Sequence, residues 1–362
     1  MDVIVDVNLD LALAEEIKKL NIPVFVYGSG EIGQSAKRKL IKYGIAVTSF
    51  IVDNEFDRAW ESISVEVCNS KYDDYVVILG FLESYYNKRV FAIKFPNARI
   101  VARLADIGGF ENIDASFFET NKYDFERFYH ELSDELSKQS FSAYLNSKVN
   151  KSLAEMKELV VLPQYTPTMR AITGEREAPF LKLRKDEVLV NCGAYDGDTI
   201  KSFLEVLGTC KNIYALEPDP SNVSLLRKYV EENSLQHMVK ILETGVSNRK
   251  DTLRFNAGGG MKSSSREDGE SIIHVDTIDS LIGHAEVTFI NMDIEGAEME
   301  ALIGAESTIR RNRPIMAISA YHKRRDCIDI PAFLKRVVPE YKFYFRLHKP
   351  LAIDAVLYAT CR

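Results

Sequence analysis

Three side chains that can carry acid–base chemistry follow two apolar runs in the C-terminal half of the chain. Asp293 and Glu295 come after residues 287–292, and His322 comes after residues 315–320. A histidine titrates near neutral pH, so it can accept the proton of a weakly acidic group such as a hydroxyl. We therefore predict that His322, Asp293 and Glu295 form a catalytic group, with His322 as the base or as a contact to the acceptor. The alternatives are that His322 is a structural residue and that Asp293 binds only the cofactor.

The same three side chains could instead hold a divalent cation, because carboxylate oxygens and an imidazole nitrogen are suitable metal ligands. The chain shows no short metal-binding spacing of the HExxH kind that would support this. We therefore keep a divalent metal as a possible cofactor that is not favoured, and we predict no metal-binding residue.

A glycine turn lies upstream of these residues. The segment VLVNCGAYDGDTIKSFLE, residues 188–205, predicts a strand, a tight turn with Gly193 and Gly197, and the start of a helix. Glycines in such a turn let backbone N–H groups approach a ligand closely, and a helix N-terminus favours negative charge. We therefore expect an anionic end of a cofactor at this turn.

A second apolar run, residues 213–216, ends at Glu217. In a doubly wound sheet an acidic residue at this place can accept hydrogen bonds from both ribose hydroxyls of a cofactor. A dinucleotide and S-adenosylmethionine would each fit. Since ligands of open α/β sheets bind beyond the carboxyl ends of the strands, Glu217, Asp293 and His322 should converge on one site.

From residue 188 to its end the chain resembles the FkbM family of S-adenosylmethionine-dependent methyltransferases. The resemblance is carried by the segments VNCGAYDGDT, YALEPDPSN, ETGVSN, VDTIDSL, NMDIEGAEMEAL and VLYAT. It implies a class I methyltransferase-like doubly wound sheet with a C-terminal antiparallel hairpin. It also implies S-adenosylmethionine as the cofactor and O-methylation of a sugar, a glycan or a nucleotide-linked acceptor.

The resemblance and the positions of the strand ends also give the expected cofactor contacts. These are Asn191, Gly193, Tyr195, Asp196, Gly197, Thr199, Glu217, Asp219, Asn222, Gly245, Val246, Ser247 and Asp293. Asn191 departs from the pattern, because the family usually has Asp there. An amide can still orient the turn and bond the cofactor, and we expect Asp196 or Asp293 to supply the charge that pairs with the methionine ammonium.

The N-terminal part has a nucleotide-binding-like pattern of its own. An apolar run, residues 24–27, precedes Gly28, Gly30 and Gly33, and Asp53 follows a second run. This GxGxxG pattern keeps open a nicotinamide-dependent oxidoreductase or a sugar-nucleotide-modifying enzyme. A further alternative is a non-catalytic module that binds a nucleotide or a cofactor. We predict no tight binding of NAD or NADP, and expect this part to position the acceptor or to support contacts in a homo-oligomer.

The pattern of the elements predicts an α/β chain in three parts. Residues 1–105 form a smaller Rossmann-like domain, residues 106–178 form a helical connector, and residues 179–362 form the methyltransferase domain. The connector is predicted from apolar side chains that recur every three to four residues.

Composition narrows the setting and the partners. The chain has 362 residues and a formal net charge of −7, which argues against nucleic acid as a main partner. We see no membrane span and no signal peptide, and five scattered cysteines without a CxxC pair indicate reduced thiols. We therefore expect a cytoplasmic enzyme that acts on a small-molecule or glycan acceptor.

Overall fold

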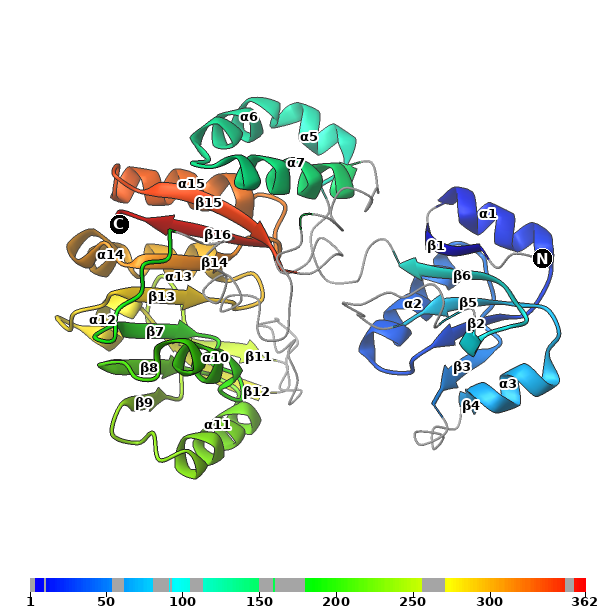
Figure 1. The fold of residues 1–362 in the computed structure, drawn as a ribbon, viewed down its shortest axis with the longest axis horizontal. Helices are drawn as coiled ribbons and strands as arrows, with labels where there is room; N and C mark the ends of the chain where they lie inside the picture. Colours follow the sequence, from blue (N-terminus) through cyan, green and yellow to red (C-terminus); the bar gives the residue numbers. More distant parts are fainter. Residues whose placement is uncertain are drawn as a thin grey trace. The chain divides into compact units, whose positions relative to one another are not determined.

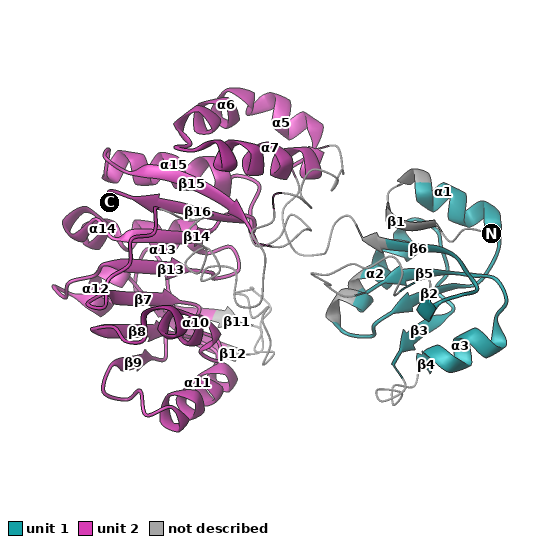
Figure 2. Ribbon diagram, viewed as in Figure 1, with its two compact units in different colours: residues 1–110 teal, residues 111–362 magenta. Residues whose placement is uncertain are grey.

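The computed structural model of the chain describes residues 4–9, 11–53, 62–80, 91, 93–104, 113–149, 159, 180–255, 271–348 and 355–362 (Figure 1). The chain divides into two compact units, residues 1–110 and residues 111–362 (Figure 2). The domain boundary expected between residues 105 and 106 lies outside the described residues, as do residues 150–158 and 160–178 of the expected connector. None of the described helices is both long enough and apolar enough to cross a membrane.

The N-terminal unit is built on a sheet of six strands, and all of its strand pairs are parallel. In sheet order these are β1 (Ile4–Leu9), β6 (Ala98–Leu104), β5 (Tyr75–Leu79), β2 (Val24–Tyr27), β3 (Ser49–Val52) and β4 (Ser62–Ser64). Its helices include α1 (Leu11–Leu20), α2 (Glu31–Lys42) and α3 (Val65–Lys71). Both β2 and β5 are buried along their whole length. This agrees with their unbroken apolar sequences, which are typical of central strands in a parallel sheet.

Three glycines allow α2 to pack closely on this sheet. A Cβ atom on Gly33 would lie 1.9 Å from the carbonyl oxygen of Gly28, which follows β2. A Cβ atom on Gly80, which follows β5, would lie 2.7 Å from Cα of Gly33. The glycine pattern of this unit therefore has a packing role that does not depend on a ligand.

The C-terminal unit is built on a sheet of seven strands. In sheet order these are β15 (Lys342–Leu347), β16 (Ala355–Thr360), β14 (Ile315–Ser319), β13 (Phe289–Met292), β7 (Val188–Cys192), β8 (Asn212–Leu216) and β9 (Val239–Leu242). The five strands from β14 to β9 are parallel, whereas β16 runs antiparallel to both of its neighbours. The predicted doubly wound sheet with its C-terminal antiparallel hairpin is therefore confirmed.

Helices and a small second sheet accompany these strands. The helices are α10 (Asp198–Leu207), α11 (Pro220–Glu232), α12 (Ile278–Ile282), α13 (Glu298–Ile303), α14 (Glu306–Asn312) and α15 (Asp326–Val337). The second sheet has the order β10 (Gly245–Val246), β12 (Ser271–Asp276) and β11 (Asp251–Phe255). The core lies between the large sheet and its helices, where the rings of Phe203 on α10 and Phe289 on β13 are 5.6 Å apart.

Three helices from the expected connector cover the β15 edge of the large sheet (Figure 1). They are α5 (Ala115–Thr120), α6 (Lys122–Glu131) and α7 (Glu135–Val149). The ring of Phe141 lies 5.3 Å from that of Phe345, and the Phe345 N–H donates to Ser137 Oγ at 3.0 Å. The fully buried Arg346 donates to Asp134 at 2.7 Å. These helices are therefore part of the C-terminal unit and protect a strand edge that would otherwise be open.

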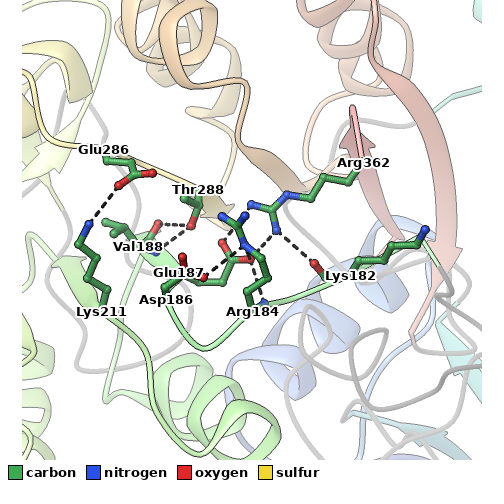
Figure 3. Close-up of polar contacts among 9 residues, drawn as sticks. All are labelled: Lys182, Arg184, Asp186, Glu187, Val188, Lys211, Glu286, Thr288 and Arg362. Carbon is green, nitrogen blue, oxygen red and sulfur yellow. Dashed lines mark hydrogen bonds and ion pairs between the residues drawn. The ribbon is translucent and has the colours of Figure 1, made fainter.

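A buried ion pair joins the start of β7 to the last residue of the chain (Figure 3). Glu187 is fully buried, and its carboxylate accepts hydrogen bonds from both terminal guanidinium nitrogens of Arg362. The backbone N–H of Arg184 donates to the same carboxylate at 3.1 Å. The entry to the sheet and the end of the hairpin strand are thus held together.

Candidate functional site

The carboxyl ends of four neighbouring parallel strands carry the residues singled out from the sequence. Gly193 follows β7, Glu217 follows β8, Asp293 follows β13, and His322 comes after β14. Because these strands are parallel and adjacent, the four loops lie along one edge of the sheet. The predicted convergence on that edge fits the place where open α/β sheets bind their ligands.

The glycine turn after β7 packs directly against the loop after β13. Gly193 has a φ of +79°, and its N–H donates to the carbonyl of Leu216 at 3.0 Å. A Cβ atom on Gly193 would lie only 2.1 Å from the backbone oxygen of Asp293. The glycine is therefore required by the protein backbone itself, in addition to any space that a cofactor needs.

We expect Gly193→Ala to destabilise the protein more than Gly208→Ala does. Gly208 has a similar φ of +72° but no atom within 4 Å of its hypothetical Cβ, so it controls for backbone conformation alone. The additional overpacking at Gly193 should lower the free energy of unfolding by about 1–3 kcal/mol more. Chemical denaturation of both variants measures the difference, and equal losses would refute the close contact with Asp293.

The rest of the turn leads into α10. Gly197, with a φ of +95°, occupies the N-cap, and Thr199 N–H donates to the carboxylate of Asp198 at 2.6 Å. Asp196 accepts from the N–H of Asp198 at 3.2 Å. Burial, followed by the charge of Asp196, raises the pKa of Asp198 to about 6. Asp198 was not among the predicted contacts, yet the charge of Asp293 also acts on it, so these carboxyl groups share one negative region.

The Glu217 carboxylate is held in place by three protein donors. Its Oε2 accepts from the N–H of Tyr195 at 2.9 Å, and its Oε1 accepts from the N–H of Asp219 at 3.0 Å and from Asn222 Nδ2 at 3.2 Å. Burial raises the pKa of Glu217, and these hydrogen bonds oppose the rise. Tyr195 has a φ of +47°, in the left-handed region. The predicted residues Tyr195, Asp219 and Asn222 therefore surround Glu217.

Asp219 and the strand β10 border the same loop. Asp219 caps α11 by accepting from the N–H of Ser221 at 2.8 Å. A Cβ atom on Gly245 would lie 3.6 Å from Pro218, which follows Glu217. Val246 is buried, and the N–H of Ser247 donates to the backbone carbonyl of Asp276 at 3.0 Å.

Asn191 lies on β7, whose neighbours in the sheet are β13 and β8, and its side chain is fully buried. Its Oδ1 accepts from Nδ2 of Asn291 on the adjacent strand β13 at 2.7 Å. Asn191 Nδ2 and Asn291 Oδ1 are buried without a hydrogen-bond partner among the described residues. The contact that the structure gives Asn191 is therefore a hydrogen bond within the sheet. Its partner Asn291 was not among the residues predicted from the sequence.

Asp293, Glu295 and His322 meet around the imidazole ring. His322 Nε2 lies 3.5 Å from Asp293 Oδ1 and 3.7 Å from Glu295 Oε2. On the other side of the ring, Nδ1 lies 2.9 Å from Oε1 of Glu298. Glu298 is completely buried, whereas the side chains of Asp293 and Glu295 are 35% and 24% exposed. The predicted catalytic trio is thus a group of four residues.

Residues 191–343 match the sequence model of the methyltransferase FkbM domain. The C-terminal unit carries an FkbM methyltransferase domain. The match supports methyl transfer that depends on S-adenosylmethionine. No curated protein matches the chain.

The chain is similar to several solved structures. The structure of methyltransferase FkbM from Methylobacillus flagellatus KT aligns with a TM-score of 0.71 and 22% identity, over 98% of this chain and 94% of that one. A putative rRNA methylase from Clostridium thermocellum aligns with a TM-score of 0.33 and 11% identity, over 50% of this chain and 90% of that one. Aeropyrum pernix fibrillarin, in complex with S-adenosyl-L-methionine, aligns with a TM-score of 0.32 and 15% identity, over 50% of this chain and 70% of that one.

The carboxylates of the FkbM domain change the acid–base properties of His322. Burial alone would lower the pKa of His322, but Glu298, Asp293 and Glu295 together raise it to about 10. Burial would likewise raise the pKa of Glu298, and the charge of His322 lowers it below its usual value. These carboxylates therefore favour the protonated ring at neutral pH, which leaves little of the neutral ring to accept a proton.

One oxygen each of Asp293 and Glu298 and one nitrogen of His322 lie within 4.8 Å of one another. A small cation could in principle contact all three. However, Nδ1 of His322 already contacts Glu298. The positive charge of a protonated ring also balances the carboxylates that would otherwise attract a cation. We therefore assign no metal ligand among the described residues of the FkbM domain.

Sequence reasoning missed Glu298 and Asp198. Both are acidic residues in the first turn of a helix, where they are common because they interact favourably with the helix dipole. From the sequence alone, the helix dipole is a sufficient explanation for both residues, so their contacts at the strand ends were not predicted. The only signal in the sequence was the repeated acidic spacing of Asp293, Glu295 and Glu298 in DIEGAE.

Proposed function

We propose that the chain is an S-adenosylmethionine-dependent O-methyltransferase that acts on a hydroxyl of a sugar, a glycan or a nucleotide-linked acceptor. The observation that supports this most is the meeting of Glu217, the Gly193 turn and the Asp293 group at one edge of the sheet in an FkbM domain. This edge can bind a cofactor and an acceptor next to each other, and positioning of two reactants supplies much of the acceleration of a transfer reaction.

The proposed cofactor site uses the charges of this edge. Glu217 would accept hydrogen bonds from the ribose hydroxyls, as its place after β8 suggests. S-adenosylmethionine carries a sulfonium and an ammonium group, and the negative region of Asp196, Asp198 and Asp293 complements both. A bound cation would also favour the ionised form of Asp198, whose pKa burial raises to about 6.

In the proposed reaction an acceptor hydroxyl attacks the methyl group of the sulfonium. The oxygen–carbon bond forms, the carbon–sulfur bond breaks, and the cofactor leaves as its neutral thioether. We assign the hydroxyl proton to the carboxylate of Asp293, because His322 already carries a proton and Asp293 is the most exposed carboxylate beside it. In this proposal His322 orients Asp293 and Glu295 through its positive charge and is not itself the base; His322 as the base or as a contact to the acceptor stays the alternative assignment.

Mass spectrometry tests the function directly. The protein is incubated with S-adenosylmethionine and a panel of free sugars, nucleotide sugars and glycans. We expect at least one hydroxyl-bearing acceptor to gain one methyl group, together with equimolar demethylated cofactor. Methylation confined to nitrogen or carboxylate acceptors would refute O-methylation while leaving methyl transfer intact.

We expect Glu217→Ala to weaken S-adenosylmethionine binding by at least about tenfold, because a hydrogen bond to a charged group contributes about 1.5–3 kcal/mol. Glu217→Gln should also weaken it, since both carboxylate oxygens accept from protein donors and an amide group would place a donor against a donor. Isothermal titration of folded variants measures both affinities. Parental affinity in both would remove Glu217 from the cofactor site.

The glycine pattern and Asp53 of the N-terminal unit are the basis of the second candidate function, a nicotinamide-dependent oxidoreductase. Asp53, the residue that a dinucleotide ribose would need, accepts from the Tyr27 hydroxyl at 2.8 Å and pairs with Lys94 at 2.6 Å. Its carboxylate is thus already engaged within the unit. We therefore propose that this unit positions the acceptor or supports homo-oligomer contacts, and that neither a nicotinamide-dependent oxidoreductase nor a non-catalytic binding module describes the chain.

The proposed setting follows from composition and thiol state. All five cysteines are free, and four of them are buried. Together with the net charge of −7, this suits a cytoplasmic enzyme whose partners are small molecules or glycans and not nucleic acids.

A further inference from the structure

Glu298 makes a set of contacts that the proposed chemistry leaves unexplained. Its Oε1 accepts hydrogen bonds from the N–H of Ile294 at 3.0 Å and of Gly296 at 3.3 Å, and it lies 2.9 Å from Nδ1 of His322. One buried oxygen therefore holds both the imidazole and the loop between β13 and α13. That loop carries Asp293 and Glu295.

The loop needs such an anchor because its backbone is unusual. Glu295 has a φ of +55° and Gly296 a φ of +100°, so two consecutive residues are in the left-handed region. A residue other than glycine in this region is held at a free-energy cost of about 1–3 kcal/mol by the surrounding structure. The two N–H donors that flank Glu295 bind Glu298, and these bonds offset that cost.

We infer that Glu298 is a positioning residue for methyl transfer, which fixes the ring of His322 through Nδ1 and so holds Asp293 and Glu295 toward the acceptor. The inference rests on the proposed function. Glu298 itself is fully buried and touches neither cofactor nor acceptor in this assignment.

The surrounding charges support this role. Three carboxylates face the ring from the β13–α13 loop and from α13, namely Asp293, Glu295 and Glu298. Asp326, the first residue of α15, is also near, and burial followed by the charge of Glu298 raises the pKa of Asp326 to about 7. Lys323 lies beside Gly296 and pairs with Glu300 at 3.5 Å. Glu298 is thus the only completely buried carboxylate in direct contact with His322 among the described residues.

Two measurements on full-length Glu298→Gln test the inference. Glutamine keeps the shape of the side chain and one oxygen for the loop N–H groups, but it removes the charge next to Nδ1. We expect the pH at which His322 loses its proton to fall by at least about 1 pH unit. Histidine NMR measures this titration, and the His322→Gln variant assigns the signal. We expect kcat to fall by about 10- to 100-fold, with the KM of S-adenosylmethionine within about threefold of the parent value.

Glu300→Gln is the matched control, because it makes the same substitution on the same helix at a side chain that is 44% exposed. It should keep the parental His322 titration and the parental kcat. A Glu298→Gln variant with parental kcat would overturn the inference. So would a reduced kcat with an unchanged His322 titration, since that result indicates a merely structural role.

The outcome can be separated from the proposed function. If the parent protein methylates no acceptor, the proposed function fails, while the NMR arm still decides whether Glu298 controls the proton of His322. If Glu298→Gln loses its cooperative thermal transition, it is replaced by Glu298→Asp. We expect both kcat and the pH at which His322 loses its proton to fall in Glu298→Asp, because the shorter carboxylate loses its contact with Nδ1 of His322 as well as with the loop. Parental kcat in Glu298→Asp would overturn the anchoring of the loop.

Discussion

Replacing Asp293 with asparagine is expected to lower the rate of methylation by about 10²–10⁴, the usual contribution of a general base. Asparagine has the same shape and can still accept a hydrogen bond from Nε2 of His322, which lies 3.5 Å from the carboxylate. It cannot take up the proton of the acceptor hydroxyl. Single-turnover kinetics with an excess of enzyme and with saturating cofactor measure the chemical step separately from any loss of cofactor affinity.

Glu295→Gln is the control for this experiment, because it removes the other carboxylate that faces Nε2 of His322. We expect its rate to fall by less than about tenfold. The reverse order, with a small effect at Asp293 and a large one at Glu295, would move the base to Glu295. Equal rates in both variants and the parent would mean that neither carboxylate accepts the proton.

The second large effect is expected in stability. Arg362→Ala should lower the free energy of unfolding by about 3–5 kcal/mol, because it removes the guanidinium that donates two hydrogen bonds to the fully buried carboxylate of Glu187. The backbone N–H of Arg184 remains as a donor at 3.1 Å, and the Arg184 guanidinium lies 3.9 Å from the carboxylate, but that side chain is 55% exposed and does not replace the two hydrogen bonds of Arg362 (Figure 3). Urea denaturation followed by circular dichroism measures the loss.

The same cluster contains its own control. Lys211 and Glu286 form an ion pair at 3.1 Å, but their side chains are 54% and 61% exposed (Figure 3). Lys211→Ala should therefore change the free energy of unfolding by at most about 1 kcal/mol. Adding Glu187→Gln to Arg362→Ala should restore part of the stability, since no buried charge then remains unpaired. A loss at Arg362 no larger than that at Lys211 would contradict the role of the buried pair.

The sequence was most informative about the strands and the residues at their ends, because local sequence patterns determine both. Apolar runs followed by glycine or acidic residues located the strand ends, and parallel strands bring such ends together, so Gly193, Glu217 and Asp293 could be placed on one edge. The antiparallel hairpin and the doubly wound sheet were predicted correctly from the resemblance to the FkbM family. These features depend on local pattern and on rules of topology.

What the sequence could not provide depends on partners that are distant along the chain. Asn191 meets Asn291 across 100 residues, and the effect of Glu298 on His322 needs both side chains in one buried place. The pKa of His322 depends on three carboxylates whose distances only the folded chain defines. For the same reason a helical pattern predicted α5 to α7 but not the strand on which they pack.

The packing of α5–α7 on β15 has a consequence for how the chain folds during synthesis. Ser137 and Phe345, which are hydrogen-bonded to each other, are 208 positions apart in the sequence. At the usual rate of about 5–20 residues per second, a ribosome needs about 10–40 s to add that length. During this interval the aromatic face of α6 and α7, with Phe128 and Phe141, has no strand to cover it. The C-terminal unit therefore completes its fold only after β15 and β16 have been made, and its early helices are candidates for chaperone binding until then.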